Sequence, residues 1–154
     1  MNTTTLMKDF LQEVEYLANK DMDATSEEDF ACCPGGKARP ATNYIAEAGL
    51  FNTVVSEVVT NPENAIDMQS RYEVLKEITT KDQSREMFTK GCRDLEAAIE
   101  STSAEDLATE VTAPWGMPST KGKLLMWGIN HSMYHLGQLN QLQLIKGDED
   151  VHWM

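Results

Sequence analysis

The segment 121–146 constrains the fold more than any other part of this chain of 154 residues, because it is apolar over most of a helical circumference. Ser119 or Thr120 is the predicted N-cap of this helix, and Gly147 is its predicted end. A helix that is apolar on nearly every side lies either at the centre of a domain or in a subunit interface. Strand-like alternation of apolar and polar residues is nearly absent elsewhere, so we expect one all-α domain.

Three further helices are predicted from apolar residues at helical spacing, over residues 3–21, 40–60 and 81–101. Pro and Gly concentrate in residues 29–40, which predicts a loop. The mixed polarity of residues 61–79 predicts a long crossover that contains one short helix. Four long helices with one crossover predict a four-helix bundle.

One face of each predicted helix should be buried. In the first helix this face is the stripe Leu6, Phe10, Val14 and Leu17. In the second helix Tyr44 shares a narrow arc with the apolar residues of the core face, so its side chain should point inward. Glu47 falls at the edge of the same arc, where a carboxylate is neither plainly buried nor plainly in water.

The chain is strongly acidic, with 25 Asp and Glu residues against 13 Lys and Arg residues and a net charge of −12. Such a surface repels phosphate backbones and anionic lipid, so nucleic acid and membrane are not expected partners. The first residues lack the order of a signal peptide, and the adjacent Cys32 and Cys33 form at best a strained disulfide. We therefore expect a cytoplasmic protein with reduced cysteines.

His131 and His135 are two of only three histidines in the chain, and they stand four residues apart on a predicted helix. At that spacing two imidazoles lie one above the other and can share one metal ion, although hydrogen-bonded core histidines show the same spacing. Ser132 stands where zinc peptidases of the His-Glu-x-x-His type have Glu, which disfavours that class. Gln138, one turn further along, can orient an imidazole, bind a ligand or satisfy polar groups between helices.

The run from His131 to Gln138 resembles the His-x-x-x-His-x-Gly-Gln signature in the last helix of the DinB-like (DinB/YfiT-like) superfamily. The run from Tyr44 to Phe51 resembles the second-helix motif of the same superfamily. The resemblance implies a four-helix bundle, commonly dimeric, with a metal site of three histidines in a cleft between helices. It also implies a relationship to thiol-dependent transferases and isomerases that act on small molecules.

The chain departs from that pattern at Tyr44, which stands where the superfamily has its first histidine. A phenol with an ordinary pKa of about 10 is a weak ligand at neutral pH, whereas the Glu47 carboxylate is an easier third ligand. The expected site is therefore His131, His135 and Glu47 around a divalent ion, zinc or nickel, with Tyr44 and Gln138 beside it. In the alternative, the metal has been lost and the Tyr44 hydroxyl is hydrogen-bonded to one of the histidines.

Two functions remain open. The first is a metal-dependent enzyme, a thiol transferase or a hydrolase acting on a small molecule. The second is a non-catalytic homodimeric bundle that binds a small ligand in the cleft left by the metal. Lys37 and Arg39 can attract an anionic substrate to this cleft, and the aromatic tail at Trp153 can dock on a neighbouring subunit.

Overall fold

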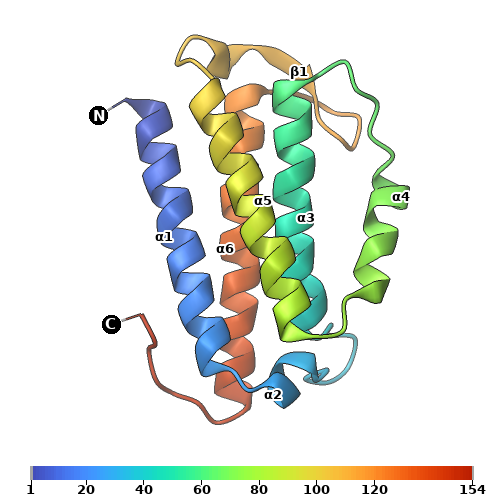
Figure 1. Cartoon of the computed structure of the whole chain (residues 1–154), viewed down its shortest axis with the longest axis vertical. Coiled ribbons are helices and arrows are strands. Elements are labelled where there is room, and N and C mark those ends of the chain that lie inside the picture. Colours follow the sequence, from blue (N-terminus) through green and yellow to red (C-terminus); the bar gives the residue numbers. More distant parts are fainter. Residues whose placement is uncertain (1, 154) are drawn as a thin grey trace.

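The structure is a computed structural model that describes residues 2–153. Its long helices α1 (Thr3–Ala24), α3 (Ala41–Thr60), α5 (Lys81–Ser101) and α6 (Lys121–Ile145) lie side by side (Figure 1). Helix α3 packs against α5 and α6, and α1 packs against the same two helices. The chain is thus mostly helical, as the sequence predicts.

A long connection between α3 and α5 carries the chain back along the outside of α3 (Figure 1). It contains α4 (Met68–Tyr72) and a 3₁₀ helix (Glu73–Glu77), where the sequence predicts a crossover with one short helix. Because of this return, α3 and α5 run in the same direction (Figure 1). Their ends nearest α2 therefore lie together, and Glu47 lies near that end of α3.

A small hairpin precedes the last helix and was not predicted. After a 3₁₀ turn (Asp106–Ala108), strand β1 (Glu110–Thr112) pairs antiparallel with β2 (Pro118–Thr120). Strands of three residues are too short to show alternation in a sequence. The apolar residues 114–118 form most of the turn between the strands and the first residue of β2.

The helix ends follow local capping chemistry. Thr80 and Gln83 form a capping box at the start of α5, and Thr120 caps α6 by accepting a hydrogen bond from the Lys123 amide. Pro40 is the N-cap of α3 and not part of its first turn. The loop predicted from residue 29 begins later, because α2 (Glu27–Ala31) is capped by the Ser26 side chain and has three acidic residues in its first turn.

The buried face of α1 differs from the prediction. Leu6 and Phe10 are 54% and 44% exposed, whereas Val14 is buried as predicted. The core face is rotated toward α5 and α6 and consists of Met7, Leu11, Val14, Ala18 and Met22. Helix α1 carries more apolar residues than one face can hold, and spacing alone does not decide which row meets its neighbours.

Two glycines allow α3 and α5 to touch through their backbones. A Cβ atom on Gly91 would lie 2.0 Å from the carbonyl oxygen of Gly49, and one on Gly49 would lie 2.2 Å from that of Met87. Side chains larger than hydrogen are therefore excluded at this crossing. The crossing lies two residues along α3 from Glu47.

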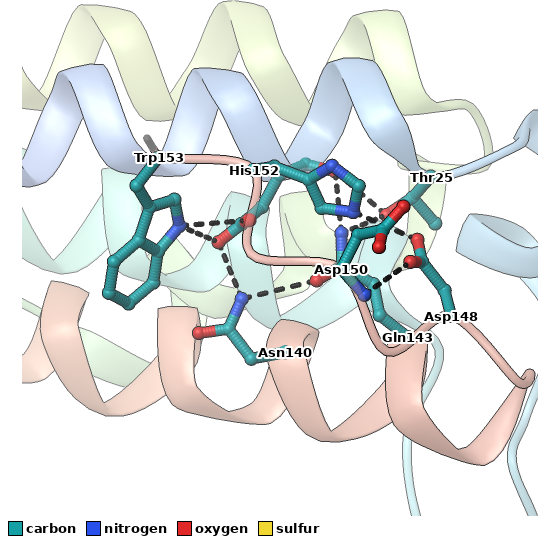
Figure 2. A network of polar contacts seen from close by, with 8 residues as sticks. Thr25, Asn140, Gln143, Asp148, Asp150, His152 and Trp153 are labelled. Carbon is teal, nitrogen blue, oxygen red and sulfur yellow. Dashed lines mark hydrogen bonds and ion pairs between the residues drawn. The ribbon is translucent and has the colours of Figure 1, made fainter.

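The C-terminal tail folds back onto its own chain (Figure 2). The Trp153 indole Nε1 donates to both carboxyl oxygens of Asp21 on α1 at 2.9 Å, and Asn140 Nδ2 donates to Asp21 Oδ2 at 2.6 Å. The tail therefore docks on α1 and α6 of its own chain. Within residues 2–153, no helix is both long enough and apolar enough to cross a membrane.

Candidate metal centre

Helices α3 and α6 bring together Glu47, His131 and His135, the three residues that the sequence predicts as ligands. One ligand atom of each lies within 4.8 Å of the other two. His135 Nε2 is 3.2 Å from His131 Nε2 and 3.8 Å from Glu47 Oε2. This spacing and donor set could hold one divalent ion, and binding of an ion stays a prediction.

Gln138 determines which nitrogen of His135 carries the proton. Its side-chain oxygen lies 2.8 Å from His135 Nδ1, and an amide oxygen only accepts, so Nδ1 donates. The lone pair of His135 is therefore on Nε2, which faces His131 and Glu47. The sequence left three roles open for Gln138, and the structure shows that it orients an imidazole. The Gln138 amide nitrogen in turn donates to the Tyr134 hydroxyl at 3.2 Å.

Both histidines are held neutral at pH 7. Burial, together with the neighbouring His135 and Arg39, lowers the pKa of His131 from 6.5 to about 4. Burial also lowers the pKa of His135, against the opposing effects of Gln138 and Glu47. A neutral imidazole has the lone pair that a metal ion needs.

Tyr44 covers the histidines without binding to them. Its ring lies nearly parallel to that of His135, with an angle of 8° between the planes and 5.7 Å between the centroids. The hydroxyl is buried and has no hydrogen-bond partner, so the hydrogen bond to a histidine expected in the metal-free alternative is not present. Burial raises the pKa of Tyr44 above its ordinary value, which disfavours a phenolate ligand.

Arg39 has a role at this site that the sequence does not reveal. Its guanidinium forms an ion pair with Glu47 Oε2 and donates to Asn43 Oδ1 at 2.9 Å. The ion pair lacks the angles of a hydrogen bond, so Glu47 Oε2 still has no hydrogen-bond donor. Glu47 is held by charge alone and remains available to a stronger cation.

Buried polar atoms without partners gather at this site. Of the four such side-chain atoms in the described part of the chain, three belong here: the Tyr44 hydroxyl, Glu47 Oε2 and His131 Nδ1. Unpaired buried polar atoms cost free energy and are rare in folded proteins. A carboxylate oxygen without a hydrogen-bond donor and an imidazole with an unpaired nitrogen, beside a second imidazole, fit a divalent cation.

Two pockets reach the site. One, of about 230 Å³, is lined by Arg39, Tyr44 and Gln138 among others. The other, of about 410 Å³, reaches His131 and is lined by aromatic side chains that include Phe51 and Trp115. Trp115 is not among the site residues predicted from the sequence. Nothing local connects it to His131, because the contact depends on how the hairpin lies over α3 and α6.

Comparison with known protein families gives a match that spans the residues of this site. The family model of the DinB superfamily matches residues 34–139, a range that includes Tyr44, Glu47, His131, His135 and Gln138. No curated protein matches the chain. The family match covers more than half of the sequence and extends from the loop before α3 into the last helix. The chain therefore belongs to the DinB superfamily.

Proposed function

We propose that this protein is a four-helix bundle of the DinB type that binds one divalent ion, zinc or nickel, through His131, His135 and Glu47. We further propose that it is a metal-dependent thiol transferase or hydrolase that acts on a small molecule. The observation that carries the proposal is the convergence of two neutral imidazoles and a carboxylate that lacks a hydrogen-bond donor. Three protein ligands leave at least one position for a substrate, as in catalytic zinc sites.

The residues around the ligands prepare them for this role. Gln138 keeps the proton of His135 on Nδ1 and thereby leaves Nε2 free. The Nε2 atoms of His131 and His135 are 3.2 Å apart, and His131 Nε2 donates its proton to His135 Nε2. If His131 Nε2 bound an ion, this proton would move to His131 Nδ1, which has no hydrogen-bond partner. A divalent ion held there would act as a Lewis acid and make a water or a thiol a better nucleophile at neutral pH.

Arg39 would lose its partner when Glu47 becomes a ligand. Its guanidinium lines the pocket of about 230 Å³ together with Gln138 and Gln141. A released arginine there favours the anionic form of a substrate, such as a thiolate or a carboxylate. Metal binding and anion binding would then support each other through the same residue.

The second candidate function is a non-catalytic bundle that binds a small ligand without metal. The Arg39–Glu47 ion pair favours this alternative, since it already neutralises the carboxylate. Tyr44, which replaces the first histidine of the family, favours it as well. The two candidates differ in metal content, and that is the quantity to measure first.

The test is the metal content of the untagged protein, purified without chelator, measured by plasma mass spectrometry. We expect about one equivalent of zinc or nickel in the wild type, and its loss in both His131→Ala and Glu47→Ala. Glu57→Ala is the matched control, because Glu57 lies on the same helix and pairs with Arg71 at the surface. Tyr44→Phe should also retain the metal.

Other outcomes would redirect the proposal. Retention of metal in Glu47→Ala together with its loss in Tyr44→Phe would assign the third ligand to Tyr44. Absence of metal in every preparation, including protein soaked with zinc and nickel, would contradict the enzyme and support the ligand-binding bundle.

We also propose a cytoplasmic homodimer. Exposed apolar side chains of α1 and α6, among them Leu6, Phe10 and Met126, line a groove of about 680 Å³. An apolar patch of this kind on an acidic protein suits a subunit interface. Sedimentation equilibrium should give twice the monomer mass of 17.2 kDa, and Phe10→Glu should give the monomer.

A further inference from the structure

A row of aromatic rings leads from the surface to His131. Trp115 and Trp127 are 42% and 55% exposed, whereas Phe51 is 7% exposed. The rings of Phe51 and Trp115 are nearly parallel, at 12°, with centroids 6.0 Å apart, and Trp127 lies 5.9 Å from Trp115. Phe51 in turn lies 4.3 Å from the His131 ring. These rings line the pocket of about 410 Å³ that reaches the candidate metal centre.

The backbone holds Trp115 in place over this pocket. The β1–β2 turn is closed by two hydrogen bonds of 2.8 Å, from the Ala113 amide to Met117 and from the Gly116 amide to Ala113. Gly116 has a φ of 85°, a conformation that favours glycine. A tryptophan exposed on a closed turn presents a fixed apolar surface, and that surface costs free energy until something covers it.

The pocket is also positive, although the protein as a whole is acidic. Lys123 lines it, and neither Asp nor Glu is among its lining residues. In the part of the chain that the structure describes, Lys123 takes no part in an ion pair. The hydroxyl of Ser119 adds a hydrogen-bond donor to the same pocket. In a chain of net charge −12, this combination favours an anionic ligand.

We infer that this pocket binds a small planar apolar molecule that carries a carboxylate. Its ring would lie against Trp115 and Trp127, and its carboxylate would contact Lys123. Trp127 and Lys123 also line the groove between α1 and α6, so the ligand would lie at the edge of the proposed subunit interface. The inference rests on the proposed function, because it assigns a substrate class to the same site. The contacts proposed for the ligand, with Trp115, Trp127 and Lys123, involve none of the proposed metal ligands, so binding does not require the metal ion.

The first test is isothermal titration calorimetry of the metal-free protein with 2-naphthoate as the probe. We expect saturable binding to the wild type and an affinity about tenfold lower in Trp115→Ala, since an aromatic contact and its buried area are lost. Tyr16→Ala is the matched control, because Tyr16 is an exposed aromatic residue that lines neither this pocket nor the neighbouring groove. Trp115→Phe, which keeps a ring, should retain most of the affinity.

Two results of this titration would overturn the inference. The first is the absence of saturable binding to the wild type. The second is a loss of affinity in Tyr16→Ala that equals or exceeds the loss in Trp115→Ala. Thermal melting of each variant by circular dichroism shows whether the fold is intact, and Trp115→Phe provides the comparison if Trp115→Ala does not fold.

The second test isolates the charge. Lys123→Gln should weaken 2-naphthoate about fivefold and leave the uncharged 2-naphthamide unchanged, because only the former has a carboxylate for the ammonium. Lys121→Gln is the matched control, since Lys121 lies on the same helix outside the pocket. Equal affinity of the wild type for the two probes would contradict a site for carboxylates.

Glu47→Gln separates this inference from the proposed function. It removes a proposed metal ligand that does not line the pocket, so it should lose metal and still bind 2-naphthoate. If the wild type binds naphthoate but no metal, the proposed function fails and the pocket stands. If it binds metal but no naphthoate, the substrate class fails and the metal site stands.

Discussion

Two clusters of polar side chains in this protein differ in how well their atoms are partnered. Around Asp21, which is 1% exposed, the carboxyl oxygens accept hydrogen bonds from Trp153 and Asn140 (Figure 2). Around His135, which is equally buried, the Tyr44 hydroxyl and Glu47 Oε2 have no hydrogen-bond partner. A cluster with its bonds complete stabilises the fold, whereas a cluster with bonds left open is prepared for a ligand.

The largest effect should come from breaking the complete cluster. Asp21→Ala removes the acceptor of Trp153 and Asn140 and should lower the free energy of unfolding by about 3 kcal/mol. Urea unfolding of the metal-free protein measures this change. Asp23→Ala is the control, because Asp23 pairs with Arg85 at the surface, and it should cost less than about 0.5 kcal/mol. Equal costs would show that the Asp21 cluster has no special role.

The open cluster should instead gain stability from metal. Free zinc at about 100 times its dissociation constant should raise the free energy of unfolding by about 2.7 kcal/mol, because it binds only the folded site. Thermal denaturation with and without zinc measures the gain. His131→Ala should lose the gain and His152→Ala should keep it. A gain of the same size in His131→Ala would place the zinc at another site.

Lowering the pH should reduce the stability of the metal-free protein through His131 in the open cluster. The pKa of His131 is about 4 in the folded state and near 6.5 in the unfolded state, so between these pH values unfolding takes up a proton. Stability of the metal-free protein should therefore fall as the pH is lowered from 6.5 towards 4, by up to about 1.4 kcal/mol per pH unit for each proton taken up.

Urea unfolding as a function of pH checks this dependence. The difference in slope between the wild type and His131→Gln isolates the contribution of His131. His152→Gln is the comparison variant, because His152 pairs with Asp148 in the C-terminal tail, away from the candidate metal centre. A wild-type slope that persists in His131→Gln would assign the dependence to other groups.

The smallest expected effects have opposite signs in the two clusters. Tyr44→Phe removes a buried hydroxyl without a partner and should stabilise the metal-free protein by about 1 kcal/mol. Trp153→Phe removes a hydrogen-bond donor from Asp21 and should destabilise it by about 1 kcal/mol. Paired urea titrations measure both. Destabilisation in both variants would remove the distinction between the clusters.

Much of the site could be predicted from local spacing. His131 and His135 share one face of α6 because residues four apart do so in any helix. The same periodicity places Tyr44 and Glu47 on neighbouring parts of α3, and Gln138 one turn beyond His135. The prediction that Glu47 approaches the histidines needed the family resemblance as well, because spacing within one helix says nothing about which helix it faces.

Long-range contacts were missed where no local pattern reports them. Arg39 pairs with Glu47 across the start of α3, Trp115 stacks on Phe51 from a hairpin, and Trp153 returns to Asp21 on α1. The sequence likewise could not decide that Leu6 and Phe10 remain exposed. Each of these facts depends on the angle and depth at which separate elements pack.

The sequence by itself determined the helical class, most helix ends and the pairing of the two histidines, because hydrogen bonds and side-chain periodicity within a helix act over a few residues. Only the tertiary structure decided that the open cluster lies between two pockets and that its carboxylate is held by Arg39. Those properties come from the packing of α3 against α6 and of the β1–β2 turn over both. This packing brings side chains far apart in the chain into close contact, and local sequence does not specify it.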